Sequence, residues 1–200
     1  MMILIEVNQV DAAVLPLSQF KQHLRLGTGF AEDSAQDDVL EGYIRAALAA
    51  IEGRTGQAIF QRDFIWTVQS WANPEGQAFP LAPVRSIQQV TLVDKAGARL
   101  SEDAGGFTFV EDSFEPKFRA LQGTLPEPPK DGKVEVLLTA GAALDWSQVP
   151  PDLAQAILLM ASHYYEYRND VALGKGCTPF GVTALLERYR PMRIGFGGRS

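Results

Sequence analysis

Residues Pro150–Arg168 read PPDLAQAILLMASHYYEYR, and this stretch decides the fold of the C-terminal part of the chain. Prolines suit the first turn of a helix, and an acid at position 152 suits its positive end. Apolar residues then recur every three or four positions, which predicts a helix that begins near Pro151.

This helix carries two apolar stripes side by side. The first contains Leu153, Ala156, Ile157, Met160, Tyr164 and Arg168, and the second contains Ala154, Leu158, Ala161 and Tyr165. One stripe faces the core of the chain. The second indicates either a contact with another protein or a helix buried on several sides, and the sequence of this segment leaves both interpretations open.

Elements on both sides of a β-rich region complete the predicted fold. A long helix is expected from Asp37 to Gly56, because acids open it, apolar residues line one face and a glycine ends it. From Arg62 to Gly141, apolar and polar residues alternate in segments that predict five or six strands. The connections between these segments are short, which favours antiparallel pairing.

The predicted fold class is therefore α+β, a helical bundle with an inserted, mainly antiparallel β domain. The expected parts are an N-terminal helical part at residues 1–61, the β domain at 62–141, C-terminal helices at 142–190 and an extended basic arm at 191–200. Trp66 and Trp71 fall in the first β segment at odd spacing, so we expect them on opposite faces of the sheet unless a bulge intervenes.

Charge is distributed unevenly along the 200 residues, whose net charge is −6. Four arginines and one acid give Leu186–Ser200 a charge of +3, so the rest of the chain carries −9. An acidic body argues against wrapping by duplex DNA, which needs clustered cations. The basic end indicates either docking on an acidic protein surface or a solvated terminus.

Reactive groups are few. The one cysteine, Cys177, permits no internal disulfide and no cysteine-based zinc site, which favours a reducing compartment. His23 and His163 are better explained as surface or packed residues, and no nucleophile motif accompanies them. We therefore predict no catalytic, cofactor or metal site, and we expect neither a signal peptide nor a membrane-spanning run.

Four segments together resemble the head–tail connector (adaptor) proteins of long-tailed phages, in the branch with a β insertion that also occurs in prophages and gene transfer agents. The segments are LPLSQFKQHLRL, DDVLEGYIRAALAAIEGRTGQAI, FPLAPVRSIQQVTLVDKAGARL and VPPDLAQAILLMASHYYEYRND. The resemblance spans Leu17 to Asp170, and it depends on the order and spacing of these segments.

The resemblance implies a structural virion protein without catalytic activity, made and assembled in the bacterial cytoplasm. It implies a ring of about a dozen copies under the portal, in which each copy contacts the next head-to-tail. The ring would extend the DNA channel, let DNA pass without sequence-specific binding, and present a surface to the stopper or tail-completion protein.

Two surfaces are the candidate binding sites of such an adaptor. The expected portal-binding arm contains Arg190, Arg193, Ile194, Phe196 and Arg199, with arginines for acidic groups and apolar side chains as anchors. The expected subunit interface contains Leu158, Tyr164, Tyr165 and Tyr167, because tyrosines are favoured at protein contacts.

Two other function classes remain open at this stage. The first is a non-viral scaffold or regulatory module that binds another protein through a sheet edge, without catalytic activity. The second is a hydrolase that uses carboxylates, since acids are plentiful. The state of association in solution separates the scaffold from the adaptor.

Overall fold

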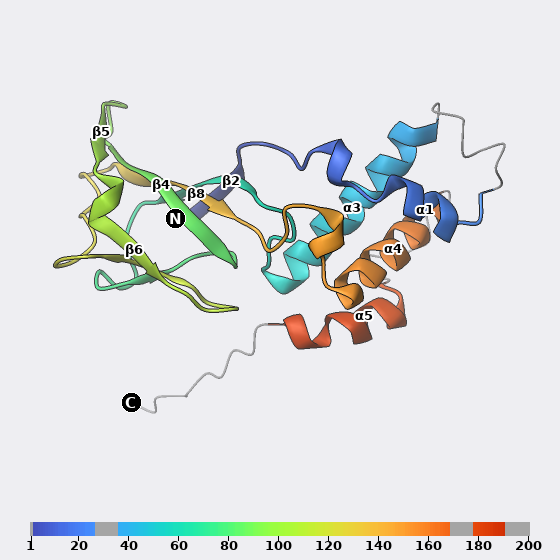
Figure 1. The fold of residues 1–200 in the computed structure, drawn as a ribbon. Coiled ribbons are helices and arrows are strands. Elements are labelled where there is room, and N and C mark those ends of the chain that lie inside the picture. The colour runs from blue at the N-terminus through green and yellow to red at the C-terminus, as the bar shows by residue number, and fades with distance from the viewer. Residues whose placement is uncertain (1, 27–35, 169–177, 191–200) are drawn as a thin grey trace. The chain divides into compact units, whose positions relative to one another are not determined.

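The computed structural model describes residues 2–26, 36–168 and 178–190 (Figure 1). The chain divides into two compact units. The β unit contains Met1–Leu15 and Gln57–Val149, and the helical unit contains Pro16–Gly56 and Pro150–Ser200. No helix of the described residues is long and apolar enough to cross a membrane.

Two antiparallel sheets form the β unit. The five-stranded sheet has the order β1 (Met2–Glu6), β2 (Arg62–Val68), β8 (Lys133–Ala140), β4 (Val84–Val93) and β5 (Arg99–Glu102). The three-stranded sheet has the order β3 (Gln77–Ala78), β7 (Lys117–Ala120) and β6 (Phe107–Val110). Short 3₁₀ helices lie at Ala12–Val14, Ala104–Gly106 and Trp146–Gln148.

The core of the β unit is shared by both sheets. Inward residues of β2, β4 and β8 alternate with outward ones and pack against the rings of the smaller sheet. Trp66 and Trp71 lie in this same core with ring centroids 5.8 Å apart, so the prediction of opposite faces is wrong. The reason is that β2 ends at Val68, and strand alternation no longer governs Trp71.

The helical unit contains α1 (Leu17–His23), α3 (Asp37–Thr55), α4 (Pro151–Glu166) and α5 (Phe180–Leu186), followed by the 3₁₀ helix η5 (Glu187–Tyr189). α3 begins with Asp37 and Asp38 and ends at Gly56, whose φ of 68° is the left-handed conformation of a helix C-cap. Leu40, Ile44 and Ile51 of α3 are buried.

The predicted α+β class is confirmed, including the antiparallel pairing of the inserted strands. The structure differs from the predicted parts at three places, the first of which is residues 57–61, which belong to the β unit and not to the N-terminal helical part. Residues 2–15 belong with the β unit, because β1 pairs along its length with β2, and so do residues 142–149. The region from Arg62 to Gly141 holds seven strands, since the two-residue β3 adds one to the expected number.

Candidate assembly surfaces

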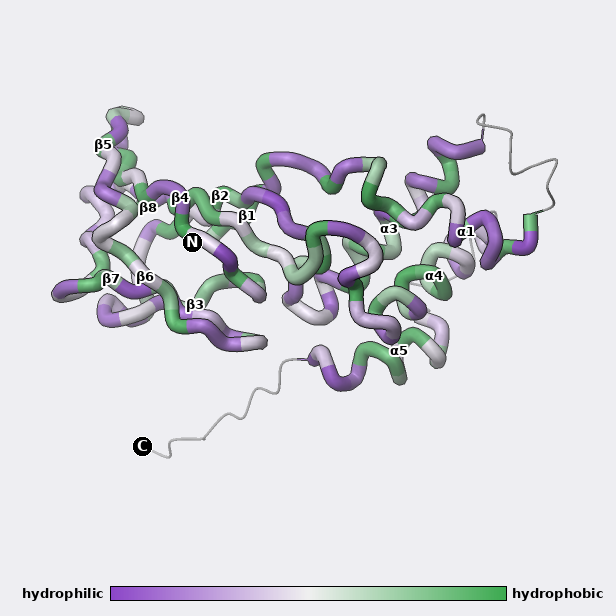
Figure 2. Tube along the Cα trace, viewed as in Figure 1, coloured by the Kyte–Doolittle hydropathy of each residue, from purple (hydrophilic) through white to green (hydrophobic). Residues whose placement is uncertain are grey.

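The core-facing side of α4 follows the first predicted stripe through most of the helix. Leu153, Ala156, Ile157 and Met160 are buried, whereas Tyr164 is half-buried and Arg168 is exposed. α4 packs against α3, which lies far from it in the sequence, and against α5, the next helix of the chain; Figure 2 shows hydrophobic residues recurring along these helices. This packing fixes α4 as the central helix of its unit.

The second stripe of α4 is partly covered by the chain itself. Ala161 is fully buried, and the ring of Tyr165 meets the ring of Tyr43 in α3 edge-on at 6.0 Å. The Arg168 guanidinium lies over the ring of Tyr165, 4.6 Å from its centroid. The second stripe is therefore partly buried within the chain, and its half-buried aliphatic residues are Ala154 and Leu158.

Aromatic side chains remain accessible at the C-terminal end of α4. Tyr167 is 46% exposed, and its ring contacts that of His163 at a tilt of 47°, with a centroid distance of 4.7 Å. Tyr164 is half-buried and lies beside His163. We call Leu158, Tyr164, Tyr165 and Tyr167 the tyrosine surface. The contact with Tyr167 gives His163 a packed role.

η5, which leads into the predicted arm, is fixed to the first turn of α4. The Tyr189 hydroxyl donates to Asp152 Oδ1 at 2.8 Å, and Arg188 Nε lies 2.9 Å from Asp152 Oδ2. Burial, followed by the hydrogen bond to Asp152, raises the pKa of Tyr189 above its usual value. These contacts with Asp152 fix the position of η5 against the first turn of α4.

Only the first residue of the predicted arm lies in the described part of the chain. Arg190 is exposed, and its Nη1 lies 3.9 Å from Glu187 Oε2, a loose surface pair. Arg193, Ile194, Phe196 and Arg199 lie outside the described residues.

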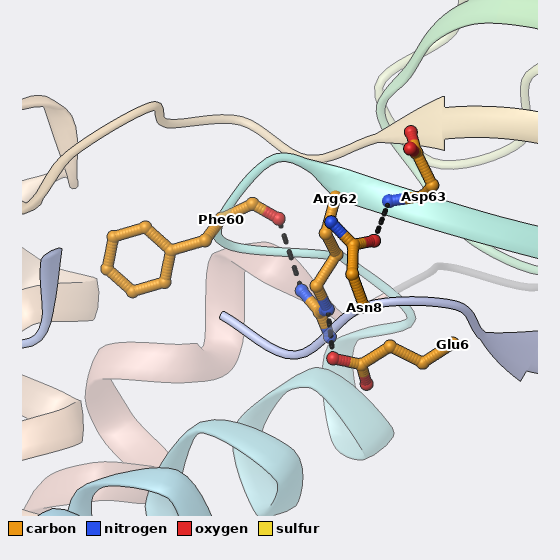
Figure 3. Close-up of polar contacts among 5 residues, drawn as sticks. All are labelled: Glu6, Asn8, Phe60, Arg62 and Asp63. Atoms are coloured by element: carbon orange, nitrogen blue, oxygen red, sulfur yellow. Dashed lines mark hydrogen bonds and ion pairs between the residues drawn. The ribbon is translucent and has the colours of Figure 1, made fainter. Parts of the chain in front are cut away.

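A third surface, which the sequence analysis missed, is the edge strand β1. All five of its residues are exposed, although four are aliphatic or Met. The strand is held by polar contacts instead: Arg62 Nε donates to Glu6 Oε1 at 2.8 Å, and the Asp63 N–H donates to Asn8 Oδ1 at 2.9 Å (Figure 3). Arg62 also donates through Nη1 to the Phe60 carbonyl at 3.1 Å. The sequence feature that could have indicated this surface is the apolar run MILI before Glu6, for which no packing partner was predicted.

In the part of the chain that the structure describes, no three of the His, Cys, Asp and Glu side chains come together in a group that could hold a metal ion.

Comparison with known proteins identifies the family. The model of the phage gp6-like head–tail connector proteins matches residues 15–120. The chain belongs to this family. No protein with a curated description matches this connector.

Solved structures resemble the connector over its whole length. A chain from the neck of an empty gene transfer agent (GTA) particle, computed with C6 symmetry, is 45% identical, with a TM-score of 0.86 and coverage of 99% of this chain and 100% of that one. A chain of the native GTA virion is 45% identical, with a TM-score of 0.82 over 98% and 99% of the two chains. A chain from the neck of a native GTA particle, computed with C12 symmetry, is 41% identical, with a TM-score of 0.80 over 99% and 100%.

These findings confirm three of the predictions from sequence. The connector family is the one that the four segments resemble, and the structural role of a head–tail adaptor follows from membership. A head–tail connector is a component of the virion by definition of its role, in agreement with the predicted location.

Proposed function

We propose that this connector forms a ring of about a dozen identical copies in the neck of a phage-like particle, where it joins the portal to the stopper or tail-completion protein without catalysing a reaction. The observation that carries the proposal is the full-length similarity, at 45% identity, to a chain of a particle neck. The cyclic symmetry of the related necks supports head-to-tail contacts between copies.

The ring would extend the DNA channel. The chain before Leu186 carries a net charge of −9, which lowers its affinity for a polyanion. We infer that DNA passes through the lumen without sequence-specific binding, because strong contacts with phosphates would oppose its movement.

Deletion of the gene in the producing strain tests the role. We expect DNA-filled heads without tails in electron micrographs, and tailed particles after complementation with the intact gene. Complete, tailed particles in the deletion strain would refute the adaptor role. A purified chain that stays a dimer in the presence of portal protein would favour the scaffold module instead.

The tyrosine surface is our proposed contact between neighbouring copies. Tyr167 is its most exposed member, and Leu158, Tyr164 and Tyr165 are half-buried around the same helix. Half-buried rings with accessible edges bury area on contact at a low entropic cost.

Replacing Tyr167 by Ser tests this contact. We expect about ten-fold fewer rings on portal at equal protein concentration, with unchanged thermal unfolding, because the side chain is 46% exposed in the single chain. Phe114→Ser is the matched control, since Phe114 is an aromatic residue of similar exposure, 45%, in the β unit. Equal loss in both variants, or in neither, would exclude the tyrosine surface from the contact.

The basic end of the chain is our proposed portal-binding arm. Arg190, Arg193 and Arg199 would pair with acidic groups, and Ile194 and Phe196 would fill apolar pockets. The anchoring of η5 on Asp152 gives this segment a fixed starting point.

Truncation after Arg190 tests the arm. Binding to purified portal rings should weaken at least about ten-fold, while the urea unfolding curve stays unchanged, because the truncation keeps every described helix and strand. A chain lacking only Ser200 keeps every predicted contact and serves as the control. Portal binding of the truncated chain equal to that of the control would show that the arm is not the attachment site.

A further inference from the structure

The segment that joins the last helix to the basic arm is held by polar contacts and not by a buried core. α5 packs against α4 and buries Val182 and Leu186. η5 follows directly and contains no buried residue. Apolar packing of the chain therefore ends at Leu186, and the position of η5 depends on the hydrogen bonds and ion pairs of its side chains.

The polar contacts of η5 converge on the carboxylate of Asp152. The Tyr189 hydroxyl donates to Oδ1 and Arg188 Nε lies beside Oδ2, so each carboxylate oxygen has one partner from η5. The Leu153 N–H donates to Oδ1 at 3.0 Å, which orients the carboxylate in the first turn of α4. Arg188 also donates to the Tyr189 hydroxyl and lies over its ring, 4.7 Å from the centroid. We call Asp152, Arg188 and Tyr189 the Asp152 clamp.

Tyr189 makes the stronger of the two contacts with Asp152. Its side chain is half-buried and that of Asp152 is 21% exposed, so the hydrogen bond between them is partly shielded from water. The Arg188 side chain is 67% exposed, and water and salt screen its ion pair. Loss of the Tyr189 hydroxyl is therefore expected to open the clamp more than loss of the Arg188 charge.

The backbone that follows the clamp is restricted as well. Arg190 has a φ of −77° and a ψ of 128°, which is an extended conformation. It precedes Pro191 in the sequence, and a proline confines the residue before it to this extended region. Because Tyr189 is held and Arg190 is restricted, the clamp sets the direction in which the chain leaves η5.

We propose that Asp152, Arg188 and Tyr189 are positioning residues of the portal-binding arm, whose start they hold in the direction in which the arm docks. The proposal rests on the proposed docking of the arm on the portal. A segment that starts from a fixed direction loses less conformational freedom on docking than one that follows a mobile turn. The clamp therefore strengthens attachment through the arm and not through a contact of its own with the portal.

Portal binding by full-length and truncated chains tests the clamp. Tyr189→Phe removes one hydroxyl and keeps the ring, and Asp152→Asn removes the charge with which Arg188 pairs. We expect each variant to bind purified portal rings about five-fold more weakly than the wild type. In chains that end at Arg190, neither substitution should weaken binding further, because the segment that the clamp positions is absent.

Two substitutions in α3 are the matched controls. Tyr43→Phe removes a tyrosine hydroxyl, and Asp38→Asn removes an exposed carboxylate from the first turn of a helix, as Asp152→Asn does in α4. Both controls should bind the portal like the wild type. Hydrogen exchange gives a second measurement without portal: the Arg190 N–H donates to the Glu187 carbonyl at 3.3 Å, and it should exchange faster in the two clamp variants than in the controls.

The outcomes separate the clamp from the arm. Equal weakening of full-length and truncated chains would refute the proposal, because Asp152 and Tyr189 would then act on the helical unit or touch the portal themselves. Wild-type binding by both clamp variants, together with weaker binding after truncation, would also refute it and leave the arm as the attachment site. An Arg190 amide that exchanges at the wild-type rate in both variants would show that Asp152 does not hold η5. Truncation without effect would overturn the role of the arm, and the clamp with it.

Discussion

We expect the Phe118→Ala variant to unfold with a free energy about 3–5 kcal/mol lower than that of the wild type, the range for deleting a large buried ring. Phe118 is fully buried in the β unit. Its ring lies 5.3 Å from Phe107, 5.7 Å from Phe79, 5.9 Å from Trp71 and 6.1 Å from Trp66. The substitution removes one side of four aromatic contacts, and close-packed rings cannot collapse into the space without losing their geometry.

Urea unfolding followed by tryptophan fluorescence measures this loss. The three tryptophans of the chain, Trp66, Trp71 and Trp146, all belong to the β unit, so the signal reports that unit. Leu121→Ala is the control: Leu121 is 60% exposed, and we expect a change within about 0.5 kcal/mol. A Phe118→Ala loss as small as that of the control would show that the ring cluster does not hold the two sheets together.

Elements set by local sequence were predicted well. α3 carries its acids, its apolar face and its terminal Gly56 within one continuous segment, so nothing distant is needed to recognise it. The spacing of Leu153, Ile157 and Met160 likewise predicts the buried face of α4. Periodicity reports which residues share a face, and burial follows where that face is the most apolar one.

Features that depend on distant residues were not predictable. Tyr165 is covered by Tyr43, which lies more than a hundred positions earlier, so spacing within α4 could not show how much of its second stripe is free. β1 pairs with a strand that starts at Arg62, and no local pattern links MILIE to that strand. Trp71 follows the end of β2, a boundary that alternation does not mark.

The candidate surfaces likewise divide into one that local sequence indicates and one that depends on distant residues. The tyrosine surface was predicted from composition, because three tyrosines within four residues are conspicuous in a sequence. The open edge of β1 was missed, because an edge exists only relative to the other strands of a sheet. Function came from the order of four weak segments, since an adaptor that works through shape and contacts has no reactive motif to detect.

Gly141→Ala is the second substitution with a large expected effect, a loss of at least about 3 kcal/mol in the free energy of unfolding or failure to fold. Gly141 follows β8 and has a φ of +137°, which residues with a side chain rarely adopt. A Cβ at this position would lie 2.3 Å from the Phe60 carbonyl oxygen and 2.5 Å from the Gln61 Cα. Both neighbours are backbone atoms, so no side-chain rotation relieves the contact.

The backbone around Gly141 is also fixed from several directions, which is why we expect the clash to cost more than the conformation alone. The Gly141 N–H donates to the Pro83 carbonyl at 3.0 Å, and the Ala142 N–H donates to the Ile59 carbonyl at 3.0 Å. Gly97→Ala separates the cost of the backbone conformation from the cost of the clash, because Gly97 has a φ of +87° but no atom within 4 Å of an added Cβ. We expect about 1 kcal/mol for Gly97→Ala in the same urea experiment. Equal losses at the two glycines would mean that the chain segments at Gly141 move apart freely, and that the close approach of Phe60 to this turn does not stabilise the β unit.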